Sequence, residues 1–215
     1  MKSLEKYKTI LWDFDGVILD SMPVRELGFR TVLKNYPHNQ IEELIKFHQE
    51  NGGWSRFVKI RYFFEKIRKE EVSTDFIQSL CNEFSSVMKS KLTSKELLIS
   101  DSLDFIKRNH LTFQMHIVSG SEHGELNFLC KELGINSFFL SINGSPTSKI
   151  QHVSNLIEEN SYDCREVILI GDSRNDWEAA TANGIHFAGF NNIEIENLGE
   201  FYIYRFDFPN HFKVV

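Results

Sequence analysis

The chain has 215 residues, of which 41% are hydrophobic and 25% are charged, and these values exclude a disordered chain and suit one domain with a modest insert. Its 30 acidic residues outnumber its 24 basic residues, and the net charge of −6 argues against a nucleic-acid partner held by general electrostatic attraction. The cysteines Cys81, Cys130 and Cys164 form no CxxC pair, which favours a reducing compartment. We expect a cytoplasmic protein with no membrane partner, because no stretch approaches about 18 apolar residues and the first residues lack the pattern of a signal peptide.

Short apolar runs predict the strands of a parallel sheet. The first run, residues 9–14, ends in Asp-Gly and predicts a buried strand that stops at a turn. Four further strands are predicted by similar runs at residues 113–118, 138–142, 167–170 and 185–188, and an extra strand is possible at 201–208. Helical periodicity is found between them, at about residues 103–108, 122–133, 149–159 and 174–182, with Asp101 or Ser102 as the N-cap of the first of these helices. This alternation predicts an α/β fold with a doubly wound, Rossmann-like parallel sheet.

A long helical stretch interrupts this alternation. Residues 22–93 show helical periodicity and no convincing strand, with helices expected at about 41–49, 57–68 and 76–89. The clearest loop inside the stretch is Asn51-Gly52-Gly53. We therefore predict a core domain made of residues 1–20 and 95–215, and an inserted α-helical cap domain made of residues 21–94.

Acidic residues follow two of the predicted strands. Asp13 and Asp15 end the first strand, and their spacing places both carboxylates on one side of the chain. Asp172 and Asp176 follow the strand at 167–170. Helix capping explains one of the latter two acids, but a cation explains all four, because neighbouring carboxylates repel one another. Since only oxygen ligands are present, Mg²⁺ is favoured over Zn²⁺.

Candidate anion-binding groups follow the strands predicted at 113–118 and 138–142. Ser119-Gly120 precedes a predicted helix, where a hydroxyl and backbone N–H groups suit a phosphate, although an ordinary turn or N-cap also explains them. Lys149 opens another helix, where a cation opposes the helix dipole unless an anion lies beside it. Acids, a hydroxyl and a lysine at one sheet edge together predict a phosphate-ester site.

The order of these motifs resembles the haloacid dehalogenase-type phosphohydrolase superfamily. The motifs are DFDGVILDS from Asp13, a strand-end Ser119, Lys149 and GDSRND from Gly171. The helical insertion is similar to that of members with a helical cap, such as phosphoglycolate phosphatases and β-phosphoglucomutases. The resemblance implies that Asp13 is the nucleophile that forms an aspartyl-phosphate, and that Asp15 is the general acid and then the general base.

The resemblance also implies a ligand set. Mg²⁺ would be held by Asp13, Asp172 and the backbone carbonyl of Asp15, with Asp176 supporting the metal or its waters. The phosphoryl group would be bound by Ser119 and the N–H of Gly120 and screened by Lys149. Dehalogenase members lack an acid at the second position of the first motif, so Asp15 indicates phosphate-ester or phosphoryl-transfer chemistry.

The identity of the substrate stays open at this stage. We expect a Mg²⁺-dependent phosphatase of a small phosphorylated metabolite, such as a sugar phosphate, phosphoglycolate or a nucleotide. A β-phosphoglucomutase-like mutase and a non-catalytic phosphate-binding regulator are the alternatives. Arg56 and Lys59, which follow the Gly52-Gly53 loop, are candidates for substrate specificity, but a solvated helix face explains them equally well. We expect a monomer, and a dimer is the alternative.

Overall fold

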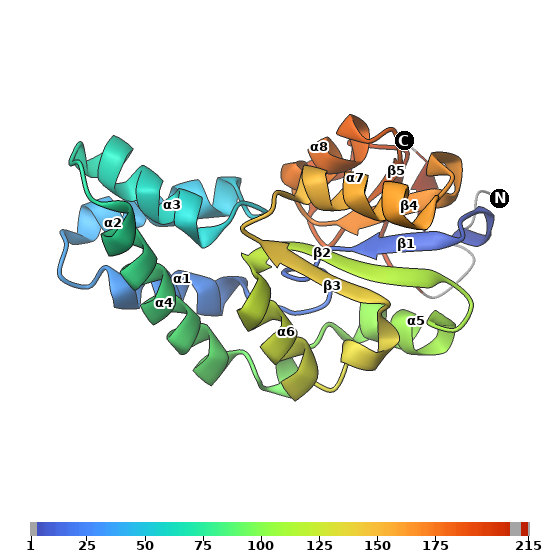
Figure 1. Ribbon diagram of the computed structural model, residues 1–215, viewed down its shortest axis with the longest axis horizontal. Helices are drawn as coiled ribbons and strands as arrows, with labels where there is room; N and C mark the ends of the chain where they lie inside the picture. Colours follow the sequence, from blue (N-terminus) through green and yellow to red (C-terminus); the bar gives the residue numbers. More distant parts are fainter. Residues whose placement is uncertain (1–3, 207–211, 215) are drawn as a thin grey trace.

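The computed structural model describes residues 4–206 and 212–214. Figure 1 shows two parts: a sheet with helices on both of its faces, and a group of helices, α1–α4, that lies beyond one end of the strands. We call this group the helical unit; its members are α1 (Met22–Val32), α2 (His38–Glu50), α3 (Arg56–Tyr62) and α4 (Thr74–Lys91). None of the helices in the described ranges is long and apolar enough to cross a membrane.

The sheet has the strand order β3-β2-β1-β4-β5-β6-β7. The first six strands pair in parallel and β7 pairs antiparallel to β6. The strands are β1 (Thr9–Trp12), β2 (Gln114–Glu122), β3 (Ser141–Ser145), β4 (Val167–Gly171), β5 (His186–Phe190), β6 (Phe201–Ile203) and β7 (Phe212–Val214). The predicted α/β fold with a doubly wound parallel sheet is therefore confirmed.

Both faces of the sheet are buried, which explains why its strands are apolar throughout. Along β1, Ile10 and Trp12 face one hydrophobic cluster and Leu11 faces the other. The first cluster includes residues of α5 (Ser100–Asn109) and α6 (His123–Glu132), and the second includes residues of α7 (Lys149–Asn160) and α8 (Arg174–Ala182). Alternating side chains of one strand thus contact two helical layers. These layers lie on opposite faces of the sheet (Figure 1).

The helical unit is packed around aromatic side chains. Phe29 of α1 lies 4.7 Å, ring centre to ring centre, from Phe84 of α4. The three predicted helices are present, although the stretch predicted as one helix at 57–68 changes from α3 into a π-helical segment, η2 (Phe63–Arg68). The sequence analysis gave no residue range for a helix at α1. The domain boundaries at residues 20/21 and 94/95 stay a prediction.

Two of the predicted strands are displaced. β2 continues to Glu122 instead of ending at Val118, because the chain stays paired with β3 across a register shift between those two residues. The strand predicted at 138–142 begins only at Ser141, because residues Asn136–Phe138 form a 3₁₀ turn after Gly134, whose φ is +73°.

Two smaller predictions were also wrong or incomplete. The N-cap of α5 is Ile99, and Asp101 and Ser102 lie inside the helix. The hydroxyl of Ser102 instead donates to the carbonyl of Val17, and the Asp101 carboxylate accepts from the N–H of Phe206. The possible strand at 201–208 is realised as β6 over its first three residues only, and residues 207 and 208 lie outside the described residues.

Candidate active site

The carboxyl ends of three neighbouring strands form the floor of the candidate site. β1 lies between β2 and β4, so Asp13 after β1, Ser119 within β2 and Asp172 after β4 come to one edge of the sheet. In an open parallel sheet this edge is where ligands bind. The structure thus brings the predicted strand-end residues together, while their chemical roles stay predictions.

Lys149 lies at a helix N-terminus, where a positive charge is unfavourable, because two carboxylates lie beside it. It is the first residue of α7, whose N-cap is Ser148, and it is 4% exposed. Its Nζ lies 3.0 Å from Oδ1 of Asp13 and also donates to Oδ1 of Asp176. These two carboxylates outweigh the burial of the ammonium and raise the pKa of Lys149, so it is a fixed positive charge beside Asp13.

Three carboxylates meet at this edge. Asp13, Asp172 and Asp176 each offer an oxygen, and these oxygens lie within 4.8 Å of one another. Burial, followed by the repulsion from Asp176, raises the pKa of Asp13 to about 7, and burial and the charge of Asp13 raise the pKa of Asp172 well above its usual range. Such a cluster is costly without a cation, and oxygen donors are those that Mg²⁺ takes.

The three acids differ in how well they fit a metal. Both oxygens of Asp176 already accept hydrogen bonds, from Lys149 on one side and from the N–H and hydroxyl of Ser173 on the other. Within the described residues, the Asp172 carboxylate receives no hydrogen bond. Asp172 also lies so close to Gly16 that a Cβ there would be 1.9 Å from Oδ2. The donor set therefore fits Mg²⁺, with Asp13 and Asp172 as ligands and Asp176 in a supporting place.

The carboxylate of Asp15 points away from this cluster and toward the helical unit. Its Oδ1 accepts from Nε of Arg25 at 2.7 Å and from the hydroxyl of Ser21, and its Oδ2 accepts from the hydroxyl of Ser121 at 2.6 Å. Burial opposes ionisation, but the charge of Arg25 and these hydrogen bonds outweigh it and lower the pKa of Asp15. A metal would therefore meet Asp15 through its backbone and not through its carboxylate.

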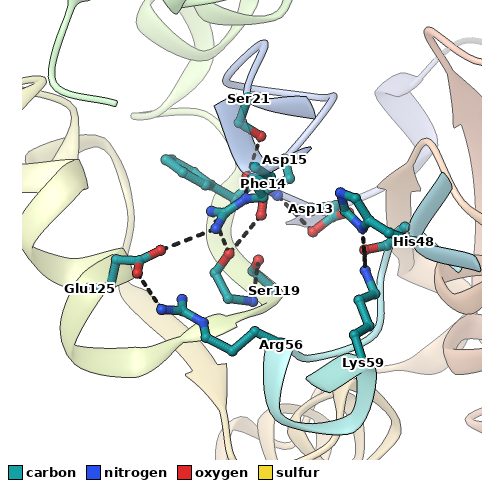
Figure 2. Close-up of polar contacts among 12 residues, drawn as sticks. Asp13, Phe14, Asp15, Ser21, His48, Arg56, Lys59, Ser119 and Glu125 are labelled. Carbon is teal, nitrogen blue, oxygen red and sulfur yellow. Dashed lines mark hydrogen bonds and ion pairs between the residues drawn. The ribbon is translucent and has the colours of Figure 1, made fainter. Parts of the chain in front are cut away.

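A buried glutamate joins Arg25 to the next arginine of the helical unit. Glu125, on α6, is fully buried; its Oε1 lies 3.1 Å from Nη1 of Arg25, and its Oε2 lies 2.5 Å from Nη1 of Arg56. Nη2 of Arg25 also donates to the hydroxyl of Ser121 at 2.7 Å. Figure 2 shows the carboxylate of Glu125 next to the guanidinium group of Arg56. Asp15 is thus connected through Arg25 and Glu125 to Arg56.

Lys59 lies on the opposite side of the site, next to His48 (Figure 2). Its Nζ lies 2.8 Å from Nδ1 of His48 and donates to the carbonyl of Gly52 at 3.0 Å. Burial and the charge of Arg25 lower the pKa of Lys59 to about 7, against the attraction of nearby carboxylates. Burial and Lys59 together lower the pKa of His48 to about 2, so His48 is neutral and accepts from Lys59.

A small cavity separates the strand ends from the helical unit. Its volume is about 30 Å³, and its lining includes Asp13 and Ser119 from the sheet and Arg56 and Lys59 from the helical unit. Such a volume holds a few water molecules at most. A molecule larger than a few waters would fit here only if the helical unit moved away from the strand ends.

One predicted feature of the phosphate loop differs in the structure. Ser119 and Gly120 lie within β2, and α6 begins after them with Glu122 as its N-cap. The Glu122 carboxylate accepts from the N–H groups of Gly124 and Glu125, so these N–H groups are not free for an anion. Ser119 is 1% exposed and its hydroxyl accepts from the N–H of Ser121. Of the loop residues, Ser119 and Gly120 therefore stay the predicted anion-binding groups.

Sequence reasoning missed Arg25, Ser121, Glu125 and His48. Ser21 stands at the N-cap of α1, but its hydroxyl donates to Asp15 and not to the helix. The solvated face considered for Arg56 and Lys59 is excluded, because these side chains are 7% and 2% exposed.

A model of the haloacid dehalogenase-like hydrolases matches residues 10–190. The chain belongs to this family. Membership of a hydrolase family indicates an enzyme, and the matched residues contain the whole acid cluster, Lys149 and the helical unit. A comparison with curated proteins gave no match.

Solved structures of the family share the fold. A β-phosphoglucomutase from Clostridium difficile has a TM-score of 0.73 at 16% identity, over 94% of this chain and 92% of that chain. A predicted phosphoglycolate phosphatase from Haemophilus somnus has a TM-score of 0.70 at 18% identity, over 95% and 89%. A family hydrolase from Streptococcus pneumoniae has a TM-score of 0.65 at 19% identity, over 86% and 85%. At these identities the likeness shows the fold alone, within a family of phosphatases and mutases.

Proposed function

We propose that this chain is a Mg²⁺-dependent phosphatase that hydrolyses a small phosphorylated metabolite through an aspartyl-phosphate on Asp13. The observation that carries the proposal is the contact of Asp13 with Lys149 inside a cluster of three carboxylates at the strand ends. This arrangement combines a nucleophile, a fixed positive charge and a set of oxygen donors for a cation. Membership of the haloacid dehalogenase-like hydrolases supports it.

Asp13 is suited to attack phosphorus. Oδ1 accepts from the N–H of Phe14 at 2.8 Å and contacts Lys149, and within the described residues no hydrogen bond is made to Oδ2. In the proposed first step a carboxylate oxygen of Asp13 forms a bond to phosphorus, and the bond from phosphorus to the leaving oxygen breaks. Bound Mg²⁺ would supply positive charge to the phosphoryl oxygens. Ser119, Gly120 and Lys149 would bind and screen the same group.

Asp15 would make the proton transfers once its carboxyl group has left Arg25, whose charge and hydrogen bond keep it ionised in this structure, and has taken up a proton. In the first step it gives a proton to the leaving oxygen, and in the second it takes one from the water that attacks the phosphorus of the aspartyl-phosphate. Arg25, Ser21 and Ser121 hold its carboxyl group in one orientation. The products are the free alcohol, inorganic phosphate and the unchanged enzyme.

The helical unit would act as a cap. In the proposal it opens to admit the substrate and closes so that bulk water is excluded from the aspartyl-phosphate. We also propose a cytoplasmic location, and the free thiols of Cys81, Cys130 and Cys164 support a reducing compartment. A phosphorylated metabolite, rather than a macromolecule, suits a site that lies between the helical unit and the strand ends.

The direct test is the release of phosphate from p-nitrophenyl phosphate and from a panel of phosphorylated metabolites, with and without Mg²⁺. We expect Mg²⁺-dependent release by the wild-type protein and none by Asp13→Asn. Isomerisation of a hexose 1-phosphate without net release would instead indicate a mutase. Binding of phosphate esters with no turnover would indicate a non-catalytic regulator.

A further inference from the structure

A second, larger cleft reaches the strand ends from the side. Its volume is about 350 Å³, against about 30 Å³ for the cavity above the strand ends, and Met22, Gly52 and Asp172 line both. Its other walls come from the C-terminus of α2 and from the residues that follow β4 and β5. Of the three clustered carboxylates, Asp172 is the one that lines this cleft. The cleft therefore meets the acid cluster at Asp172.

The charged residues of the cleft are mostly acidic. Among the described residues its lining holds one base, Arg174, and four acids: Asp20, Glu50, Asp172 and Glu194. Asp20, Glu50 and Glu194 are exposed, and none of them forms an ion pair within residues 4–206 and 212–214. Acids gathered in a cleft make its potential negative, because the protein walls focus their field. Such a cleft attracts cations and repels phosphate esters.

Two asparagines after β5 hold the backbone at the inner end of the cleft. The side-chain amide of Asn192 donates to the carbonyl of Asp172 at 2.8 Å, and that of Asn191 donates to the carbonyl of Gly16 at 2.9 Å. The backbone of Asp172 is thus fixed, whereas its carboxylate receives no hydrogen bond in the described part of the chain. This carboxylate is left for a ligand that arrives through the cleft.

The size of the cleft suits a hydrated cation. Mg²⁺ loses its octahedral shell of water molecules reluctantly, so it travels as a hydrated ion. At roughly 30 Å³ for each water molecule, the cleft has room for about ten of them, which is enough for the ion and its shell. The cavity above the strand ends has no such room while the helical unit lies against them. In this closed arrangement the cation and a phosphate ester would need different routes.

We propose that this cleft is a side entrance for Mg²⁺, through which the cation reaches Asp172 while the helical unit stays against the strand ends, and that Asp20, Glu50 and Glu194 attract it. The inference rests on the proposed Mg²⁺ dependence of the enzyme. It separates the exchange of the metal from the movement that admits the ester. The enzyme is therefore loaded with its cation before the helical unit opens.

A reversible lock on the helical unit tests the route. A Cβ on Gly52, in the loop between α2 and α3, would lie 3.8 Å from Cβ of Ser173, a separation typical of a disulfide. The variant carries Gly52→Cys and Ser173→Cys, with Cys164→Ser to remove the partly exposed native thiol. Its reduced form is the matched control, because the hydroxyl of Ser173 is lost in both forms and only the bridge differs.

Two readouts are taken from each form. Stopped-flow fluorescence with a Mg²⁺ indicator gives the rate of Mg²⁺ binding, and p-nitrophenyl phosphate gives the release of phosphate. We expect the oxidised form to bind Mg²⁺ within about threefold of the rate of the reduced form, and to release phosphate about a hundredfold more slowly.

Charge variants test the attraction. Asp20→Asn, Glu50→Gln and Glu194→Gln, combined in one chain, should slow Mg²⁺ binding by about tenfold at low ionic strength and by much less in about 0.5 M salt. The control combines Asp104→Asn, Glu132→Gln and Glu159→Gln, which remove the same charge from exposed acids outside the cleft. It should bind Mg²⁺ at the wild-type rate.

Three results would overturn the side entrance. They are Mg²⁺ binding that the bridge slows by more than about tenfold, equal binding rates in the two charge variants, and phosphate release that the bridge leaves unchanged. A failure of the phosphatase function looks different, because the wild type and the reduced form would then bind Mg²⁺ and release no phosphate. The two Mg²⁺ binding rates still decide the route in that case. A wild type that binds no Mg²⁺ would overturn both proposals.

Discussion

The carbonyl oxygen of Gly53 occupies the place where a side chain on Gly120 would begin: a Cβ on Gly120 would lie 2.2 Å from it. Gly53 lies in the loop between α2 and α3, and Gly120 lies in β2. Gly53 also packs against the end of β4, since a Cβ on Gly53 would lie 2.9 Å from the hydroxyl oxygen of Ser173. Two glycines thus allow the helical unit to touch the strand ends.

The first prediction concerns this contact. Gly120→Ala places a methyl group against the carbonyl group of Gly53. Because backbone cannot move aside as a flexible side chain can, the helical unit should be held away from the strand ends. We expect kcat/KM to fall by about a hundredfold or more, because general acid–base and electrostatic effects of this size need a closed site. Small-angle scattering should show a larger radius of gyration. Gly52→Ala is the control for closure, since its Cβ would meet only Cβ of Ser173 at 3.8 Å; wild-type activity in Gly120→Ala would refute the account of closure.

The second prediction concerns Arg25. Its guanidinium group donates hydrogen bonds to Asp15, Ser121 and Glu125 at the same time. The ammonium group of a lysine does not reproduce this geometry. Both Arg25→Met and Arg25→Lys should therefore lower kcat on p-nitrophenyl phosphate, by roughly 10²-fold for the methionine, because Asp15, the proposed proton-transfer group, loses its orientation. Steady-state kinetics at saturating substrate measures this. A full rescue by lysine would show that charge, and not the fork, is what Arg25 contributes.

The third prediction concerns the metal. Burial and mutual repulsion destabilise the carboxylates of Asp13 and Asp172, so Mg²⁺ should raise the melting temperature, by the equivalent of about 2.7 kcal/mol at a hundred times its Kd. Asp172→Asn should weaken this response and should be more stable than the wild type when Mg²⁺ is removed by a chelator. Asp163→Asn, at the opposite end of β4, is the control. Equal Mg²⁺ responses in all three proteins would exclude the acid cluster as the metal site.

The fourth prediction follows from the pKa of Lys59, which is about 7 in the folded protein and 10.5 in a free lysine. Below pH 7 both states hold the proton, and the folded state bears the full cost of a buried ammonium. Between about pH 7 and 10.5 the unfolded state binds more protons than the folded state, so the contribution of this residue to stability rises with pH. Lys59→Met should therefore unfold at a higher temperature than the wild type. This difference in melting temperature should be largest at pH 6–7 and smaller by pH 9–10. A pH-independent difference between the two melting curves would contradict the lowered pKa.

The sequence predicted those parts of the site that depend on strand order. Asp13, Ser119 and Asp172 each follow or end a recognisable apolar run, and parallel pairing brings such positions to one edge without further information. Lys149 was predictable for a related reason, since a cation that opens a helix needs a nearby anion. Membership of the family is consistent with the same motifs.

The residues that were missed depend on the packing of the helical unit, which no local pattern indicates. Glu125 lies in the first turn of α6, where an acidic residue is expected because it interacts favourably with the helix dipole. The sequence therefore does not indicate that Glu125 also pairs with two arginines. Arg25 lies on a helix whose apolar periodicity is weak. The turn-like residues Ser119-Gly120-Ser121 likewise concealed that β2 continues through them, because pairing with β3 overrides their local preference.

The measurement that tests the central claim most directly is the mass spectrum of the protein after rapid acid quenching of its reaction with p-nitrophenyl phosphate and Mg²⁺. We predict one added phosphoryl group per chain, located on Asp13 by peptide mapping and missing from Asp13→Asn. The Asp13→Asn variant must remain folded for this comparison, which its melting curve establishes. Turnover of the ester with no phosphoryl group on Asp13, or with the group on another residue, would contradict the account.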